Sequence, residues 1–151
     1  MTTGFKSIFI DTNILVYISL SDFDSVKHLE SLKILNDLNK DETGLYISTQ
    51  VIREFYAVDT NQKYLMKPLS PKQANAQIDF LKKEFNVLVI NEHVISILQS
   101  LLLKFNIKSQ AVHDTTIVAT MKNFGLSNLL TYNKKDFTKF KEINIIVPQH
   151  S

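Results

Sequence analysis

The chain has 151 residues, the size of one ordinary domain, and its 44% hydrophobic share is enough to supply a sizeable core. It contains no cysteine, which excludes disulfides, thiolate metal sites and cysteine nucleophiles. The formal net charge of +2 is too small to indicate nucleic-acid binding, and the only arginine is Arg53, so lysines and backbone groups would have to contact phosphate.

Five short runs along the chain predict β-strands. Each run is continuous in apolar or β-branched residues rather than alternating in polarity, which is typical of strands buried on both faces. In chain order the predicted strands are residues 7–10, 45–48, 87–90, 129–131 and 143–147.

Helical patterns separate these strands. Apolar residues at helical spacing predict helices over residues 29–38, 74–85, 94–105 and from 112 to Gly125. Ser70 and Pro71 open one of them with a capping box and a proline at the first position, and Gly125 is placed to end the last. Residues 59–69 have the weakest pattern, and we expect a surface connection or short helix there, suited to a lid or a partner contact.

The alternation of strands and helices predicts an α/β fold in one domain over residues 1–151. Continuous apolar strands linked by helices form a parallel sheet covered by helices on both faces, in a doubly wound arrangement. Ligands bind such sheets beyond the carboxyl ends of the strands. The polar residues that follow the strands are therefore the candidates for a site.

The first two candidates are acidic. Asp11 follows the first predicted strand directly and precedes a helix, so it lies at the ligand-binding edge; a helix N-cap is the alternative. Glu54 follows Val51 by three residues and precedes Val58 by four, so it shares the inward face of its helix. A glutamate that reaches solvent or pairs with Arg53 is the alternative there.

Asp114 and Asn133 complete the set. Ile117, Val118 and Met121 follow Asp114 at helical spacing on one face, which predicts an inward carboxylate rather than a solvated aspartate favoured by the helix dipole. Asn133 follows the fourth predicted strand, where a residue that simply forms a turn is the alternative.

Two further kinds of polar residue are weaker candidates. Asp136 is either a helix cap or a residue that supports the ligands from behind. The histidines are His28, His93, His113 and His150, and none pairs with another at ligand spacing. His113 as a general base is less favoured than a surface residue.

Three carboxylates and one amide that converge on one edge of a sheet would repel one another unless a cation lay among them. Removing isolated carboxylates from water is costly, so a bound ion is the economical solution. Ligation by oxygen alone selects Mg²⁺ or Mn²⁺ before zinc.

The N-terminal residues lack the basic start and apolar run of a signal peptide, and no apolar stretch approaches the ~20 residues needed to cross a bilayer. We therefore expect a soluble, cytoplasmic protein. The glycines, Gly4, Gly44 and Gly125, do not form the clustered loop that cradles a nucleotide. Dinucleotide and P-loop sites are excluded.

Four segments, at residues 9–16, 51–54, 113–120 and 130–137, resemble in order and spacing those of PIN-domain nucleases, especially the VapC-like toxins of toxin–antitoxin pairs. The resemblance implies a three-layer α/β/α sandwich whose five parallel strands lie in the order 3-2-1-4-5. It matches Asp11, Glu54 and Asp114 to acidic ligands and Asn133 to a fourth position often held by Asp or Asn. The residues that it implies orient these ligands are Thr12, Asn13 and Thr131.

By the same resemblance the substrate is RNA, and an antitoxin protein and a second copy of the chain are the expected partners. The expected reaction is attack of a metal-activated water on a phosphodiester, leaving a 5′-phosphate and a 3′-hydroxyl. The lysines expected to steer the RNA backbone are Lys134, Lys135, Lys139 and Lys141.

Two other functions stay open. A haloacid-dehalogenase-like phosphatase also begins with a strand that ends in aspartate, but it requires a second aspartate where this chain has Asn13. A non-catalytic RNA- or partner-binding module would keep the fold without the chemistry.

Overall fold

A five-stranded sheet forms the centre of the molecule. The computed structural model describes residues 4–63 and 65–149. The strands are β1 (Ser7–Ile10), β2 (Gly44–Ser48), β3 (Asn86–Leu88), β4 (Asn128–Leu130) and β5 (Asn144–Ile146). They lie in the order β3-β2-β1-β4-β5, and every neighbouring pair is parallel. The predicted strand order and the α/β class are confirmed.

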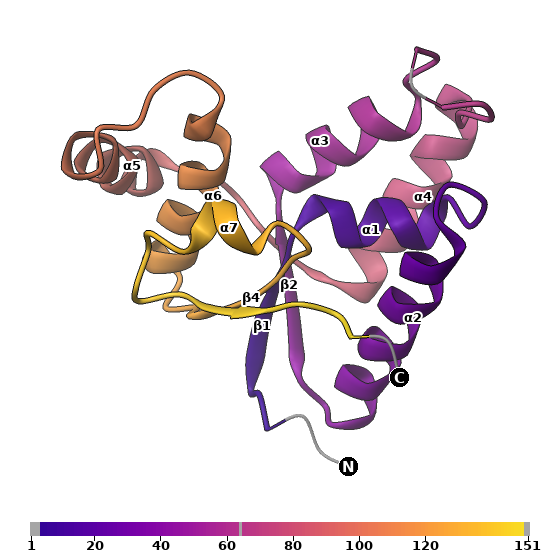
Figure 1. Cartoon of the computed structure of the whole chain (residues 1–151), viewed down its shortest axis with the longest axis horizontal. Coiled ribbons are helices and arrows are strands. Elements are labelled where there is room, and N and C mark those ends of the chain that lie inside the picture. Colours follow the sequence, from indigo (N-terminus) through magenta and orange to yellow (C-terminus); the bar gives the residue numbers. More distant parts are fainter. Residues whose placement is uncertain (1–3, 64, 150–151) are drawn as a thin grey trace.

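Helices cover both faces of this sheet. They are α1 (Thr12–Ser19), α2 (Ser25–Lys40), α3 (Thr49–Asp59), α4 (Pro71–Glu84), α5 (Glu92–Lys104), α6 (Ala111–Asn123) and α7 (Lys134–Phe137). Figure 1 shows α1 to α4 on one side of the strands and α5 to α7 on the other. After β3 the chain crosses to the other face of the sheet. As a result β1 and β4 are neighbours, and the helices that follow these two strands lie on opposite faces. A crevice at the carboxyl ends of β1 and β4 is the consequence.

The central strands carry the core, as their apolar runs predict. Ile8, Phe9 and Ile10 of β1 have no accessible surface, and neither do Leu129 and Leu130 of β4. The expectation of burial on both faces is wrong for the edge strands, because β3 and β5 are only partly buried. Each edge strand pairs with a neighbour on one side only.

Two predicted helix ends have the expected geometry. Ser70 Oγ accepts a hydrogen bond from Gln73 N at 3.1 Å, and Gln73 Oε1 accepts one from Ser70 N at 2.9 Å, so the capping box is formed. Gly125 has φ +71° directly after α6, a conformation that glycine adopts without strain.

Residues 59–69 differ in part from the surface connection that we expect. Asp59 is the last residue of α3 and has no accessible surface, and Leu65 is buried. Asp59 O accepts a hydrogen bond from Leu69 N at 2.8 Å, which ties the two ends of the connection together. Tyr64, like the terminal His150, lies outside the described residues.

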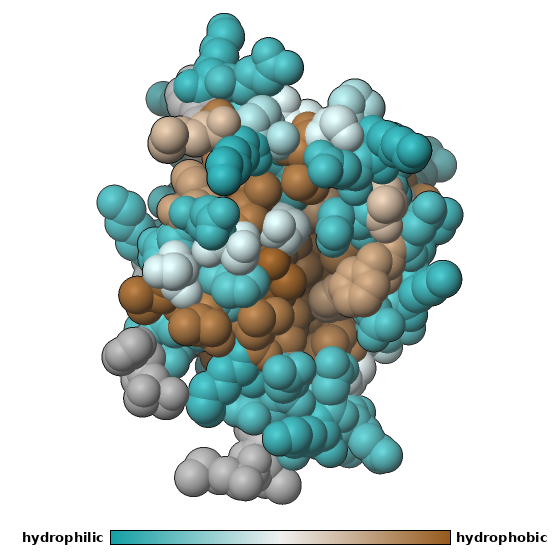
Figure 2. Space-filling view, turned by 90° about the vertical axis from the view of Figure 1, so that its right-hand side faces the viewer, coloured by the Kyte–Doolittle hydropathy of each residue, from teal (hydrophilic) through white to brown (hydrophobic). Residues whose placement is uncertain are grey.

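An apolar groove runs between α2 and α4. Its lining includes Leu32, Leu35, Phe80 and Leu81. Figure 2, which views the side where α2 and α4 lie, shows apolar residues gathered on that surface. Among the described residues, no helix is long and apolar enough to cross a membrane.

Candidate metal centre

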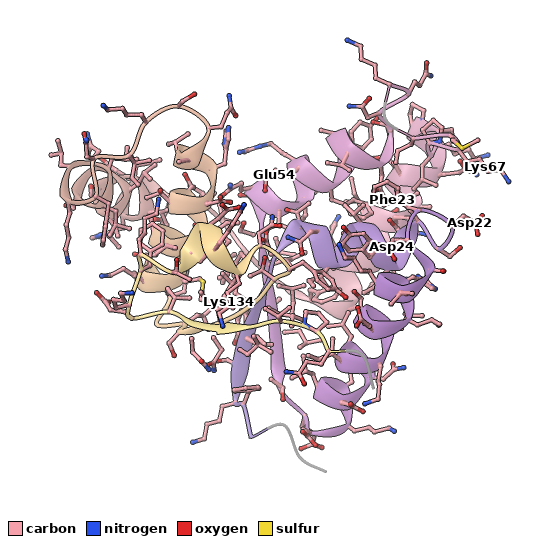
Figure 3. The ribbon with its side chains drawn as sticks, viewed as in Figure 1. Asp22, Phe23, Asp24, Glu54, Lys67 and Lys134 are labelled. Carbon is pink, nitrogen blue, oxygen red and sulfur yellow. The ribbon has the colours of Figure 1, made fainter. Side chains whose placement is uncertain are left out.

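A pocket of about 290 Å³ at the carboxyl ends of β1 and β4 brings the predicted ligands together. Its lining includes Asp11, Glu54, Asp114 and Asn133, with Thr12 and Asn13 beside them. Glu54 lies in the middle of α3, and Figure 3 shows it above the sheet, between the two helix layers. The four residues come from the end of β1, from α3, from α6 and from the turn after β4, as the strand order requires.

Asp11 is held in one orientation by three donors. Its Oδ1 accepts a hydrogen bond from Thr12 N at 2.7 Å, and its Oδ2 accepts from Thr131 Oγ1 at 2.7 Å and from Asn13 Nδ2 at 3.2 Å. The side chain is only 5% exposed. Asp11 also caps α1. The helix N-cap, which the sequence left as the alternative, and the position in the pocket are therefore both present.

The electrostatics of the pocket are those of crowded, partly desolvated acids. Burial raises the pKa of Asp11 to about 6, although hydrogen bonds from Thr131 and Thr12 lower it, and the charges of Asp114 and Glu54 raise it further. The charges repel one another across the pocket.

Asp114 has the same character. Burial is the largest reason that the pKa of Asp114 rises to about 6, and the charges of Asp136 and Glu54 add to it. His113 and Lys139 act in the opposite direction. Asp136 is exposed on α7, and its effect on Asp114 places it beside the pocket rather than in the lining.

Glu54 is oriented by Thr12, whose Oγ1 donates to Glu54 Oε1 at 3.0 Å. Among the described residues no salt bridge joins Glu54 to Arg53, the pairing that the sequence leaves open. Thr12 therefore orients two carboxylates, because its backbone N–H donates to Asp11 and its hydroxyl donates to Glu54.

Asn13 and Thr131 form a second network that joins the ends of β1 and β4. Asn13 Nδ2 donates to Thr131 Oγ1 at 3.2 Å, and Asn13 Oδ1 accepts from Tyr132 N at 3.2 Å. Thr131 Oγ1 also accepts from Asn133 N at 3.0 Å. These bonds fix the turn that carries Asn133.

The side chain of Asn133 lines the pocket and is exposed. Within the described part of the chain it makes no capping hydrogen bond to α7, while Asn133 O accepts from Asp136 N at 3.0 Å. The backbone of Asn133 therefore forms the turn that was the alternative, and its side-chain amide oxygen is available to bind an ion.

Gln50 is a contributor that our sequence reasoning did not identify. It is buried on α3, one helical turn before Glu54, and its Nε2 donates to His113 O at 2.9 Å. This bond joins α3 to α6 at the residue before Asp114. The signal in the sequence was a polar residue on the inward face of α3, but its partner is a backbone carbonyl 63 residues away and has no signature.

The predicted phosphate-steering lysines are all exposed and none lines the pocket: Lys134, Lys135, Lys139 and Lys141. Lys139 lies close enough to Asp114 to lower its pKa. In Figure 3 Lys134 extends from α7 on the side away from Glu54. Of the predicted histidines, His113 is exposed, in line with the surface alternative.

The donor set fits a hard divalent ion that keeps part of its water shell. Within residues 4–63 and 65–149 no three His, Cys, Asp or Glu side chains are grouped so that they could hold a metal together. Mg²⁺ keeps several waters and is usually bound directly by one or two carboxylates. Oxygen ligands in a pocket of mutually repelling acids suit that mode of binding, with Asp11 and Asp114 as the most desolvated donors.

Comparison with known proteins gives one family. The model of the PIN domain family matches residues 8–143 of this chain. No curated protein sequence matches it.

Several solved structures have the same fold. VapBC2 from Rickettsia felis, bound to a promoter DNA fragment, is 20% identical with a TM-score of 0.66 over 93% of this chain and 98% of that chain. A toxin–antitoxin complex from Klebsiella pneumoniae is 23% identical with a TM-score of 0.64 over 95% and 99%. VapC20 from Mycobacterium tuberculosis, described as a sarcin-ricin loop cleaving toxin, is 16% identical with a TM-score of 0.66 over 88% and 95%. At these identities the likeness shows a shared fold.

Proposed function

The chain belongs to the PIN domain family, and from that premise we propose that it is an endoribonuclease that hydrolyses RNA phosphodiester bonds with the help of Mg²⁺ or Mn²⁺. The proposal takes residues 1–151 as one nuclease domain. The observation that carries it is the pocket lined by Asp11, Glu54 and Asp114, in which burial and neighbouring charges disfavour the ionised forms of Asp11 and Asp114. Such an arrangement is retained where a cation is to be bound.

The residues that would hold the ion are Asp11, Asp114, Glu54 and Asn133. When bound, the ion would lower the pKa of a water for attack on phosphorus and stabilise the leaving oxygen. The chain's own contribution is positioning: Thr131 and Asn13 hold Asp11, and Thr12 holds Glu54. Mutations of such supporting residues typically weaken metal binding or activity about 10- to 100-fold.

The neutral Asn133 limits the negative charge of the site. Its amide offers an oxygen without adding a charge, so the phosphate of the substrate would supply the remaining negative charge around the metal. The expected products are a 5′-phosphate and a 3′-hydroxyl.

We further propose that the chain is the toxin of a toxin–antitoxin pair in the cytoplasm, bound by a small antitoxin protein and assembled as a homodimer. Support comes from the structural neighbours, which include a toxin–antitoxin complex and a toxin described as cleaving the sarcin-ricin loop. The apolar groove between α2 and α4 adds a surface of the kind that a protein partner covers.

The geometry disfavours the phosphatase alternative. That chemistry needs an acid–base group where this chain has Asn13, and both ends of the Asn13 amide are committed to Asp11, Thr131 and the backbone of Tyr132. A phospho-aspartate trapped on Asp11 would be the evidence in its favour.

The test is cleavage of total cellular RNA by the wild type and by Asp114→Asn, with Mg²⁺, with Mn²⁺ and with EDTA. Asp79→Asn, which changes an exposed carboxylate on α4, is the matched control. We expect metal-dependent cleavage that is lost in Asp114→Asn and kept in Asp79→Asn. Equal activity in all three proteins would indicate a contaminant, and no activity in any would favour the non-catalytic module.

A further inference from the structure

Aromatic side chains form the wall of the pocket next to the carboxylates. Tyr17 and Phe23 line the same pocket as Asp11 and Asp114. Their ring centroids lie 5.8 Å apart with an interplanar angle of 18°, so the two rings are stacked. Phe23 belongs to the connection between α1 and α2, and Figure 3 shows it on the same side of the sheet as Glu54.

Phe23 is not a core residue. It is 52% exposed, whereas the core residues Phe9, Phe55 and Phe137 are almost fully buried. An apolar ring left half in water gains free energy when another flat surface covers it. Phe23 therefore offers one covered side to Tyr17 and open area to the pocket.

The ring beneath Phe23 is rigidly supported. Tyr17 packs edge-on against Tyr132, with centroids 5.3 Å apart and an interplanar angle of 81°. The Nζ of Lys27 lies 5.1 Å from both tyrosine ring centroids. Tyr132 is fixed in turn by a hydrogen bond from its hydroxyl to Glu30 Oε1 at 3.0 Å. The wall is preorganised and carries a positive charge.

These features match an unpaired nucleotide better than a duplex. Single strands bind where aromatic rings stack on bases beside cations that meet the phosphates. In an A-form duplex the base faces are already stacked on their neighbours, so they are not available for stacking on a side-chain ring. A base covering Phe23 would leave its own phosphate next to the carboxylate pocket, since both belong to one cavity.

We propose that Phe23, backed by Tyr17, is the stacking platform for an unpaired base adjacent to the cleaved phosphodiester, and that Lys27 supplies the positive charge on this wall. The inference rests on the proposed ribonuclease function. It makes Phe23 a residue that selects single-stranded or looped RNA, independently of which metal is bound.

The chain provides a direct spectroscopic test because it contains no tryptophan. Phe23→Trp introduces a single fluorophore into the platform. Phe80→Trp, in the α2–α4 groove, is the matched control because Phe80 is 51% exposed. Both variants are titrated in EDTA with a single-stranded RNA of about 12 nucleotides and with the blunt duplex of the same sequence.

We expect the single strand to quench the fluorescence of Phe23→Trp, and the duplex to leave it unchanged. Neither RNA should quench Phe80→Trp. In a second measurement, anisotropy of the labelled single strand should show binding weakened about tenfold in Phe23→Leu and kept in Phe23→Tyr and Phe80→Leu, because base stacking needs a ring. Circular dichroism verifies that each variant is folded.

The failures of the two proposals are distinguishable. If the wild type binds or cleaves RNA while Phe23→Trp is not quenched, or is quenched equally by the duplex, the platform is refuted and the nuclease stands. Equal weakening in Phe80→Leu would also refute it. If the wild type neither binds nor cleaves any RNA, the ribonuclease proposal and the platform fall together.

Discussion

Replacing Asp59 by asparagine should make the protein more stable at neutral pH. Asp59 has no accessible surface; its Oδ2 lies 2.5 Å from Ser19 Oγ, and its Oδ1 has no hydrogen-bond partner among the described residues. Ser19 Oγ also lies 3.1 Å from Val16 O, and a hydroxyl has one proton. If that proton goes to Val16 O, the short contact with Ser19 requires a proton on Asp59. A neutral carboxylic acid at Asp59 would satisfy both contacts, because it can donate to Ser19 Oγ while Ser19 Oγ donates to Val16 O.

The magnitude follows from the pKa. Burial raises the pKa of Asp59 from 3.8 to about 6, against the hydrogen bond from Ser19, which lowers it. Between these two values the folded state binds a proton that the unfolded state has lost, so stability falls as pH rises and the loss is complete above about pH 6. A shift of about two pKa units corresponds to about 3 kcal/mol, and local opening that admits water would reduce it to between about 1 and 3 kcal/mol.

Asparagine keeps the shape and cannot ionise. Its amide nitrogen can donate to Ser19 Oγ as the neutral acid does. The assay is urea unfolding of the wild type and of Asp59→Asn, followed by circular dichroism, from about pH 4.5 to about pH 8. The stability of Asp59→Asn relative to wild type should rise by about 1 to 2 kcal/mol over that range, because part of the effect already lies below about pH 4.5 and titration of the other acids cancels in the difference.

Asp79→Asn is the control, since Asp79 is exposed on α4 and its difference from wild type should stay flat with pH. A difference for Asp59→Asn that is equally flat would refute the neutral-acid assignment. So would a variant that loses stability relative to wild type as the pH rises.

Three further predictions concern the pocket. Calorimetric titration measures the Mn²⁺ affinity in each of them, and urea unfolding measures the stability in the second. Thr131→Val removes the hydroxyl that donates to Asp11 Oδ2, so Mn²⁺ affinity should fall about 10- to 100-fold; unchanged affinity would mean that Asp11 needs no support. Gln50→Leu leaves His113 O without its donor, which should lower stability by about 1 kcal/mol and weaken Mn²⁺ binding; a loss of stability alone would limit Gln50 to packing. Mn²⁺ affinity should also fall as the pH drops below about 6, because Asp11 and Asp114 take up protons there, and a pH-independent affinity would contradict their role as ligands.

Much of the fold was readable from local patterns. Continuous apolar runs such as Ile8–Ile10 predicted strands buried on both faces, which is confirmed for the central strands β1 and β4. The order of the strands came from the resemblance of four motifs to PIN-domain nucleases, and the structure confirms it. The edge strands were predicted too deeply buried, since a run of apolar residues does not reveal how many neighbours a strand has.

The candidate site was found through polar residues out of pattern. Glu54 and Asp114 lie on apolar helix faces, Asp11 directly follows a buried strand, and all three line one pocket. Gln50 and Asp59 were missed for a common reason. Their buried partners, His113 O and Ser19 Oγ, lie 63 and 40 residues away along the chain.

The sequence by itself determined the alternating α/β elements, the helix ends at Ser70 and Gly125 and the acidic residues at the ends of strands, because period, capping and polarity act over a few neighbouring residues. Only the tertiary structure decided which of these residues contact one another. The bond from Thr131 Oγ1 to Asp11 spans 120 residues, and the stacked wall of Tyr17 and Phe23 is completed by Tyr132 from the far end of the chain. Such contacts depend on the pairing of β1 with β4, which global packing sets and no local pattern encodes.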